Sequence, residues 1–137
     1  MRVGREVLLR LAAAGADVAV HHRTSETAAE ETAADAREHG VEATVVSGDV
    51  TDPDAVDTLV SDCEETLGGV DVLVNAVGPL PGGRWDEIGF EAWQETIAGC
   101  LYGTYLCSQR VLPGMRDREW GRIVNFGVAD ARDDRRV

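Results

Sequence analysis

The 137-residue sequence contains no lysine: all 13 of its basic side chains are arginine, set against 25 acidic side chains. The formal charge of −12 argues against sequence-independent binding to nucleic acid, because such binding needs clustered basic side chains that displace counterions. An anionic membrane surface is disfavoured for the same reason. We therefore expect neither a nucleic-acid partner nor a membrane partner.

Cysteine and long apolar runs are also scarce. Cys63, Cys100 and Cys107 have spacings that fit neither a disulfide framework nor a zinc site, so we expect free thiols in a reducing compartment. The longest uncharged stretch, Thr96 to Gln109, is shorter than the roughly 20 residues that a transmembrane helix needs. No leader-like apolar run follows the first residues. These absences predict a soluble, cytoplasmic protein.

The spacing of apolar residues alternates between that of a helix and that of a strand along the whole sequence. Helices are expected over 4–14, 25–39, 52–67 and 90–115, and apolar strands over 17–21, 41–47, 70–75 and 122–126. Gly15, Gly40 and Gly68 are placed to end the first three helices, Asp52 to cap the third, and Pro113 to kink or end the last. Short connections between such elements predict a single α/β domain over 1–137, with a parallel sheet covered by helices on both faces.

Parallel sheets bind ligands at the carboxyl ends of their strands, so the residues that follow each strand are the candidates for a site. These segments are 22–23, 48–52, 75–78 and 127–130. The adjacent His21 and His22 point to opposite faces of a strand and have no second ligand pair, so we expect no metal site.

Five segments of the sequence stand out together: LRLAAAGADVAV, GDVTD, DVLVNAVG, AWQETIAGCLYGTYLCSQRVLPGM and WGRIVNF. In this order and at these spacings they resemble the classical short-chain dehydrogenase/reductase (SDR) family, close to the 3-oxoacyl-carrier-protein reductases. The resemblance covers nearly the whole chain. It implies a Rossmann-like fold of three layers, and an NAD(P)-dependent oxidoreductase that interconverts carbonyls and alcohols on a small-molecule substrate.

The resemblance also implies which residues bind the cofactor. They are Gly4, Arg23, Asp49, Val50, Asn75, Ala76 and Gly78. Gly4 would be the last glycine of a phosphate-binding turn. Asp49 would hold the adenine edge with Val50 against the ring, and the loop that begins at Asn75 would lie beside the ribose.

Arg23 bears on the choice of cofactor. In this family an acidic residue after the second strand accepts hydrogen bonds from the ribose hydroxyls and selects NAD. A guanidinium can instead pair with a 2′-phosphate, so we expect NADP, with NAD as the alternative.

The sequence departs from the family where catalysis is concerned. It has no counterpart of the family's first strand and glycine-rich turn before Gly4, and it ends before the catalytic Tyr and Lys. Val128 stands at the family Ser position and Cys100 at the family Asn position, so no catalytic set is complete. We therefore expect an incomplete Rossmann-like domain, truncated at both ends and inactive by itself. The alternative is a pseudoenzyme that binds a nucleotide or a partner without catalysis.

Two structural expectations follow from the missing parts. The absent first strand belongs in the middle of the sheet, so Val18–Val20 and Val72–Val74 should flank a gap. The two strands should then either pair directly with each other or stay apart as two half-sheets. In the family the long helix forms a dimer interface, so residues 90–112 should present Trp93, Ile97, Leu101 and Tyr105 for homo-oligomer formation.

Overall fold

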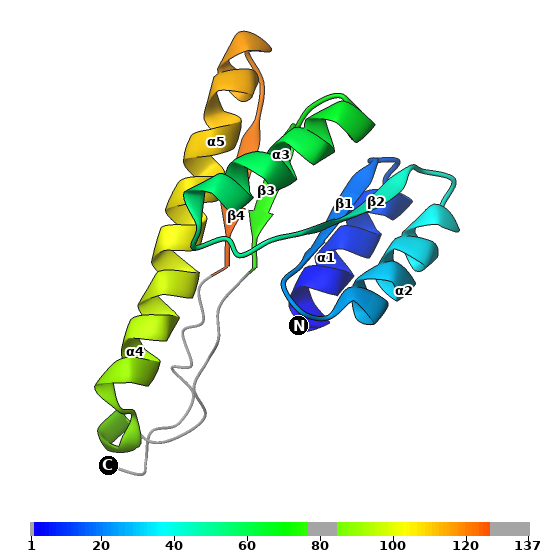
Figure 1. The fold of residues 1–137 in the computed structure, drawn as a ribbon. Coiled ribbons are helices and arrows are strands. Elements are labelled where there is room, and N and C mark those ends of the chain that lie inside the picture. Colours follow the sequence, from blue (N-terminus) through cyan, green and yellow to red (C-terminus); the bar gives the residue numbers. More distant parts are fainter. Residues whose placement is uncertain (1, 77–84, 127–137) are drawn as a thin grey trace.

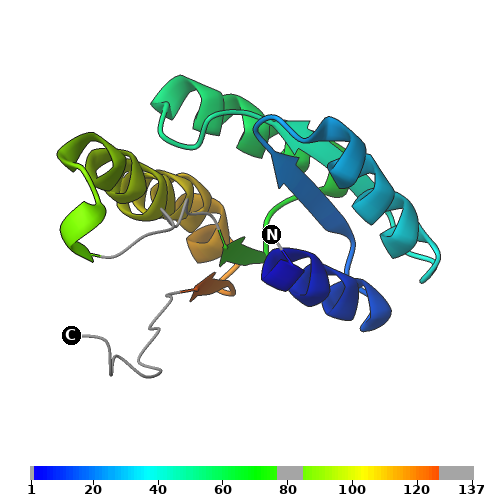
Figure 2. The same ribbon diagram turned by 90° about the horizontal axis from the view of Figure 1, so that it is seen from below.

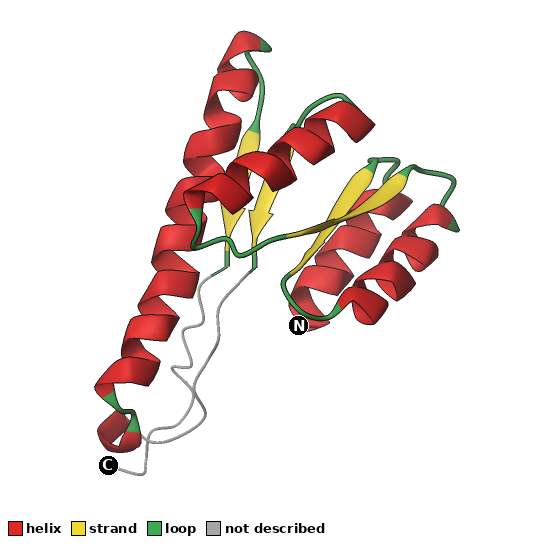
Figure 3. Ribbon diagram, in the orientation of Figure 1, coloured by secondary structure: helices red, strands yellow, loops and turns green. Residues whose placement is uncertain are grey.

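The computed structural model describes residues 2–76 and 85–126 (Figure 1). Helices and strands alternate as the sequence predicts (Figure 3). The order is α1 (Arg2–Ala13), β1 (Val18–His22), α2 (Glu26–Arg37), β2 (Ala43–Ser47), α3 (Pro53–Leu67), β3 (Val72–Asn75), the 3-10 turn η1 (Trp85–Glu87), α4 (Phe90–Ile97), the π-helical turn η2 (Ala98–Tyr102), α5 (Gly103–Asp117) and β4 (Arg122–Asn125).

The strands form two separate parallel sheets. β1 pairs with β2 from Val18 opposite Ala43 onward, and β3 pairs with β4 up to Asn75 opposite Asn125. Within the described residues β1 and β3 do not pair with each other, so of the two expected arrangements the strands adopt the separate half-sheets. The segment before β1 is a helix and supplies no strand to fill that gap. The architecture is that of an incomplete, Rossmann-like α/β fold.

Helices lie on both faces of the β1–β2 sheet, and α5 packs against β3 of the other sheet (Figure 2). On one face, Val18 packs against Ala12 of α1 and Ala36 of α2. On the other face a larger buried cluster joins α3 to α5, and residues from both sheets, including Ala19 and Leu73, pack against it. Burial of this shared apolar layer links the two sheets.

Most helix ends follow the local signals in the sequence. The Asp52 carboxylate accepts a hydrogen bond from the backbone N–H of Asp54 at 3.0 Å and caps α3, as predicted. Gly15, Gly40 and Gly68 end α1, α2 and α3 with φ values of 92°, 80° and 85°. These left-handed conformations favour glycine because it has no Cβ.

The long helix differs from its prediction at Pro113. This residue lies inside α5, which continues to Asp117, so Pro113 does not end the helix. The Pro113 side chain is exposed, whereas Val111 and Met115 on either side of it are buried in the core. Burial of these neighbours outweighs the hydrogen bond that proline cannot donate. The irregularity lies earlier, in η2, where the backbone widens to a π-helical turn between α4 and α5.

Candidate functional site

The carboxyl ends of the strands bring several of the predicted residues together. Gly48 N–H donates to the His22 carbonyl at 3.2 Å, which ties the loop after β2 to the end of β1. Across the same two strand ends, Arg23 Nη1 lies 3.6 Å from Asp49 Oδ2. At the other sheet, a Cβ on Gly4 would lie 3.4 Å from Ala76 Cβ, so the first turn of α1 packs beside the end of β3.

Asp49 is held as a carboxylate by the turn that follows it. The Thr51 backbone N–H and hydroxyl both donate to Asp49 Oδ1, at 2.9 Å and 2.7 Å. The backbone hydrogen bond, the hydroxyl bond and the nearby Arg23 keep the pKa of Asp49 below its ordinary value. The Asp49 side chain remains 43% exposed. A charged acceptor is therefore fixed in place and accessible to a ligand.

The two histidines lie on opposite faces of β1, as expected from strand geometry. His21 Nε2 lies 2.8 Å from the Gly48 carbonyl, and because a carbonyl only accepts, this nitrogen carries the proton. His22 Nδ1 is buried without a hydrogen-bond partner. Nowhere in the described segments do three or more His, Cys, Asp or Glu side chains gather as a metal site.

Val50 is part of the core. Its side chain is 7% exposed, and a Cβ built on Gly103 of α5 would lie only 2.7 Å from Val50 Cγ2. The side chain therefore anchors the Asp49 loop against α5. The contact of Val50 with an adenine ring, which the resemblance implies, stays a prediction.

Asn75 joins three elements at the end of β3. Its side chain is buried, and Nδ2 donates to Asn125 Oδ1 of β4 at 2.9 Å and more weakly to Ser108 Oγ of α5 at 3.4 Å. Sequence reasoning singled out Asn75 but missed Asn125 and Ser108. The available signal was a second asparagine at the end of an apolar strand, which the parallel register places opposite Asn75.

Residues 3–135 match the family model described as short chain dehydrogenase. The chain belongs to this family. The curated relatives that it matches include a 3-oxoacyl-[acyl-carrier-protein] reductase of Synechocystis sp., 34% identical over 90% of this chain and 50% of the relative. Others are proteins of the same name, with the suffix FabG, from Staphylococcus epidermidis (31% identical; 90% of this chain, 51% of the relative) and Staphylococcus aureus (29%; 90% and 50%). The chain thus spans about half the length of these relatives.

In the described part of this short chain dehydrogenase, few side chains could transfer a proton. Cys100 lies exposed in η2, while Val128 and Gly78 lie outside the described residues. Cys63 and Cys107 are free thiols in the core, as expected. Burial raises the pKa of both, that of Cys63 to about 11 with the help of Asp62 and Glu64, so both stay protonated at neutral pH.

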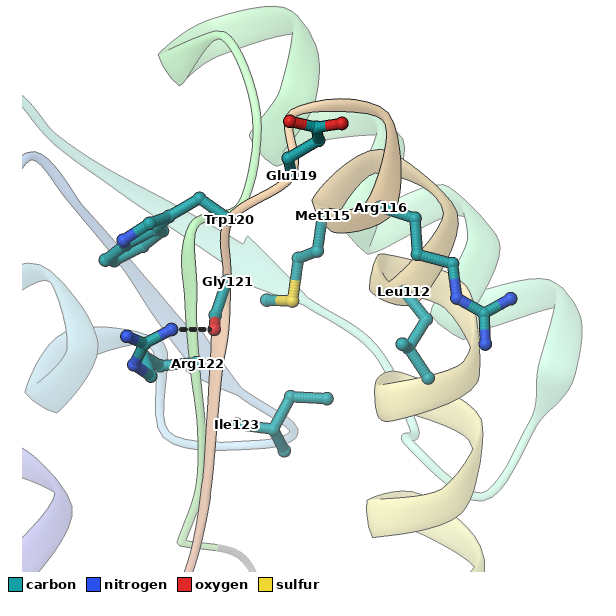
Figure 4. Close-up of a pocket in the computed structure, with 8 residues that line it drawn as sticks. All are labelled: Leu112, Met115, Arg116, Glu119, Trp120, Gly121, Arg122 and Ile123. Carbon is teal, nitrogen blue, oxygen red and sulfur yellow. Dashed lines mark hydrogen bonds between the residues drawn. The ribbon is translucent and has the colours of Figure 1, made fainter.

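A hollow lies at the end of the fold opposite to the carboxyl ends of the strands. It has a volume of about 460 Å³ and is formed where the end of α5 turns into β4 (Figure 4). Leu112, Met115 and Ile123 supply apolar walls, and the Arg122 guanidinium lies 5.1 Å from the centre of the Trp120 ring. Because this hollow is at the amino end of β4, it is separate from the candidate nucleotide site.

No helix among residues 2–76 and 85–126 is both long and apolar enough to cross a membrane.

Proposed function

We propose that this chain is the nucleotide-binding part of an NADP-dependent carbonyl reductase, and that it does not catalyse reduction by itself. The observation that carries the proposal is the Arg23–Asp49 pair at the carboxyl edge of a short chain dehydrogenase fold. The names of its relatives support a 3-oxoacyl compound, or a similar small carbonyl or hydroxyl compound, as the substrate class.

Each described residue at the edge has a task in this proposal. Asp49 accepts a hydrogen bond from adenine, and Arg23 pairs with the 2′-phosphate. Gly4 lets the first turn of α1 lie close to Ala76, beside the path of the pyrophosphate. Asn75 holds β3 and β4 in register below the ribose. A bound nicotinamide supplies the hydride.

The described residues do not supply the proton that must accompany the hydride. General acid catalysis needs a group of suitable pKa within hydrogen-bond reach of the carbonyl. The hydrogen-bonded side chains at the carboxyl ends of β3 and β4 are two amides and a hydroxyl, Asn75, Asn125 and Ser108, which do not titrate near neutral pH. The sequence contains no lysine for the family's second catalytic role.

The same facts favour a second candidate, a nucleotide-binding pseudoenzyme. Val128 at the Ser position would abolish the family's carbonyl contact even in a longer polypeptide. The two candidates differ in one respect: the reductase gains activity when the missing strand and the Tyr and Lys segment are supplied, and the pseudoenzyme does not.

Binding and turnover measurements on the 137-residue chain test the proposal. NMR titration should show chemical-shift changes at Asp49 and Thr51 with NADPH, weaker changes with NADH, and dissociation constants above about 100 μM, because several phosphate contacts are missing. No NADPH should be consumed with a β-keto ester. Turnover, or no shift with either dinucleotide at about 10 mM, contradicts the proposal.

We also propose that the partner of this chain is a second copy. Apolar side chains lie exposed along the long helix, with Leu101 59% and Tyr105 60% exposed, and Phe90 stacked on Trp93 at 5.9 Å. Several exposed apolar side chains along one helix favour association.

A further inference from the structure

The Arg23–Asp49 contact has a consequence for cofactor choice, on the assumption that the proposed nucleotide site is correct. Among the described residues, Asp49 is the sole carboxylate that pairs with Arg23. The pair joins the residue after β1 to the loop after β2, and both side chains face solvent, with 68% of Arg23 and 43% of Asp49 exposed. The guanidinium that a 2′-phosphate needs is therefore already beside an anion of the protein.

We propose that Asp49 competes with the cofactor's 2′-phosphate for Arg23, so that the preference for NADP over NAD is set by the pair and is smaller than Arg23 alone would produce. A 2′-phosphate brings close to two negative charges into the space beside the carboxylate. To pair with Arg23 it must take the guanidinium from the Asp49 carboxylate. A 2′-hydroxyl carries no charge for Arg23 to neutralise, so it leaves the Arg23–Asp49 pair in place.

Asp49 cannot easily leave this position. Both hydrogen bonds from Thr51 end on Oδ1, which holds the carboxylate plane and leaves Oδ2 toward Arg23. The Asp49 carboxyl also stays ionised at neutral pH, because the hydrogen bonds from Thr51 favour its charged form and lower its pKa. His21, the other titratable group on this side of β1, is bound to the Gly48 carbonyl and adds only a weak attraction.

The test uses two small probes, adenosine 2′,5′-bisphosphate and adenosine 5′-monophosphate, titrated into the whole chain and followed by NMR. The ratio of their dissociation constants measures selectivity for the 2′-phosphate. Removing one charge of an exposed ion pair changes binding by about two- to fivefold, so Asp49→Asn should raise the selectivity by this factor. Arg23→Gln should bring it to about one, and the double variant should behave as Arg23→Gln.

Asp54→Asn is the matched control. Asp54 is an exposed acid at the start of the next helix, it has no arginine partner within the described part, and its loss changes the net charge equally. Its selectivity should equal that of the unmodified chain. If Asp49→Asn does not fold, Asp49→Ser keeps an acceptor for the Thr51 N–H without the charge and should raise selectivity in the same way.

The outcomes distinguish failure of the proposed competition from failure of the proposed nucleotide site. Unchanged or lowered selectivity in folded Asp49 variants, with both probes still bound, overturns the competition and leaves the proposed nucleotide site intact. Failure of both probes to bind the unmodified chain overturns the proposed function, and the competition falls with it.

Discussion

Glu119 adopts a backbone conformation that the first three helices of this protein leave to glycine. Its φ of 54° lies in the left-handed region, and it is the only non-glycine residue with positive φ in the described part. The Glu119 N–H donates to the Arg116 carbonyl and the Trp120 N–H to the Met115 carbonyl, each at 3.0 Å. This pair of bonds is the Schellman ending of a helix, which places Glu119 where glycine is preferred.

Glu119→Gly should therefore stabilise the protein. A side chain with a Cβ is strained in this conformation, and the relief exceeds the added entropy of the unfolded chain, leaving a gain of about 0.5–1 kcal/mol in the free energy of unfolding. Urea unfolding followed by circular dichroism measures it. Glu119→Ala keeps the Cβ and serves as the control, which should gain nothing. Equal stability of the two variants would show that the conformation carries no strain.

At the scale of elements, α5 lies very close to the loop after β2. Gly103 is buried in the first turn of α5, and Val50 lies against it in the core cluster that also contains α3. The helix could not lie this near to the loop with any larger residue at position 103. The contact places the loop that carries Asp49.

Gly103→Ala should destabilise the protein by about 1–3 kcal/mol, because the added methyl must displace a buried valine and its surroundings. Helix propensity alone predicts the opposite sign, a gain of up to about 1 kcal/mol, so the sign decides between the two effects. Thermal unfolding is the measurement. In the double variant with Val50→Ala, the added methyl has room. The double variant should therefore lose less stability than the sum of the losses of the two single variants. A gain for Gly103→Ala alone contradicts the packing argument.

At the scale of the whole molecule, the two sheets are joined through helices and not through strand pairing. The cluster between α3 and α5 supports residues of both sheets, while the outer side of the α4–α5 helix is left apolar and exposed. The molecule therefore has one well-buried layer on that side and one surface suited to self-association.

The chain should be dimeric or larger at tens of micromolar, as measured by light scattering. Leu101→Gln and Tyr105→Gln each remove an exposed apolar side chain from that surface and should shift the protein toward monomer. Val3→Gln changes an apolar residue on α1 that is 48% exposed, and it should leave association unaltered. A monodisperse monomer of the unmodified chain at this concentration would falsify the proposed partner.

Local signals in the sequence predicted the elements themselves. Asp52 caps α3 and Gly15, Gly40 and Gly68 end their helices, because each depends on residues only a few positions apart. The alternation of helix and strand predicted parallel pairing, and the five family segments predicted the fold. The gap between β1 and β3 also followed from the resemblance, and residues 2–13 form a helix there, not a strand.

Contacts between distant residues were decided only by the tertiary structure. Asn75 bonds Asn125 across a strand register, Val50 turns into the core against Gly103, and Arg23 meets Asp49 across two strand ends. The two residues of each pair are far apart in the sequence, so no local sequence pattern predicts these contacts. The helix runs past Pro113 for the same reason: burial of its neighbours contributes more free energy than the local preference of proline removes.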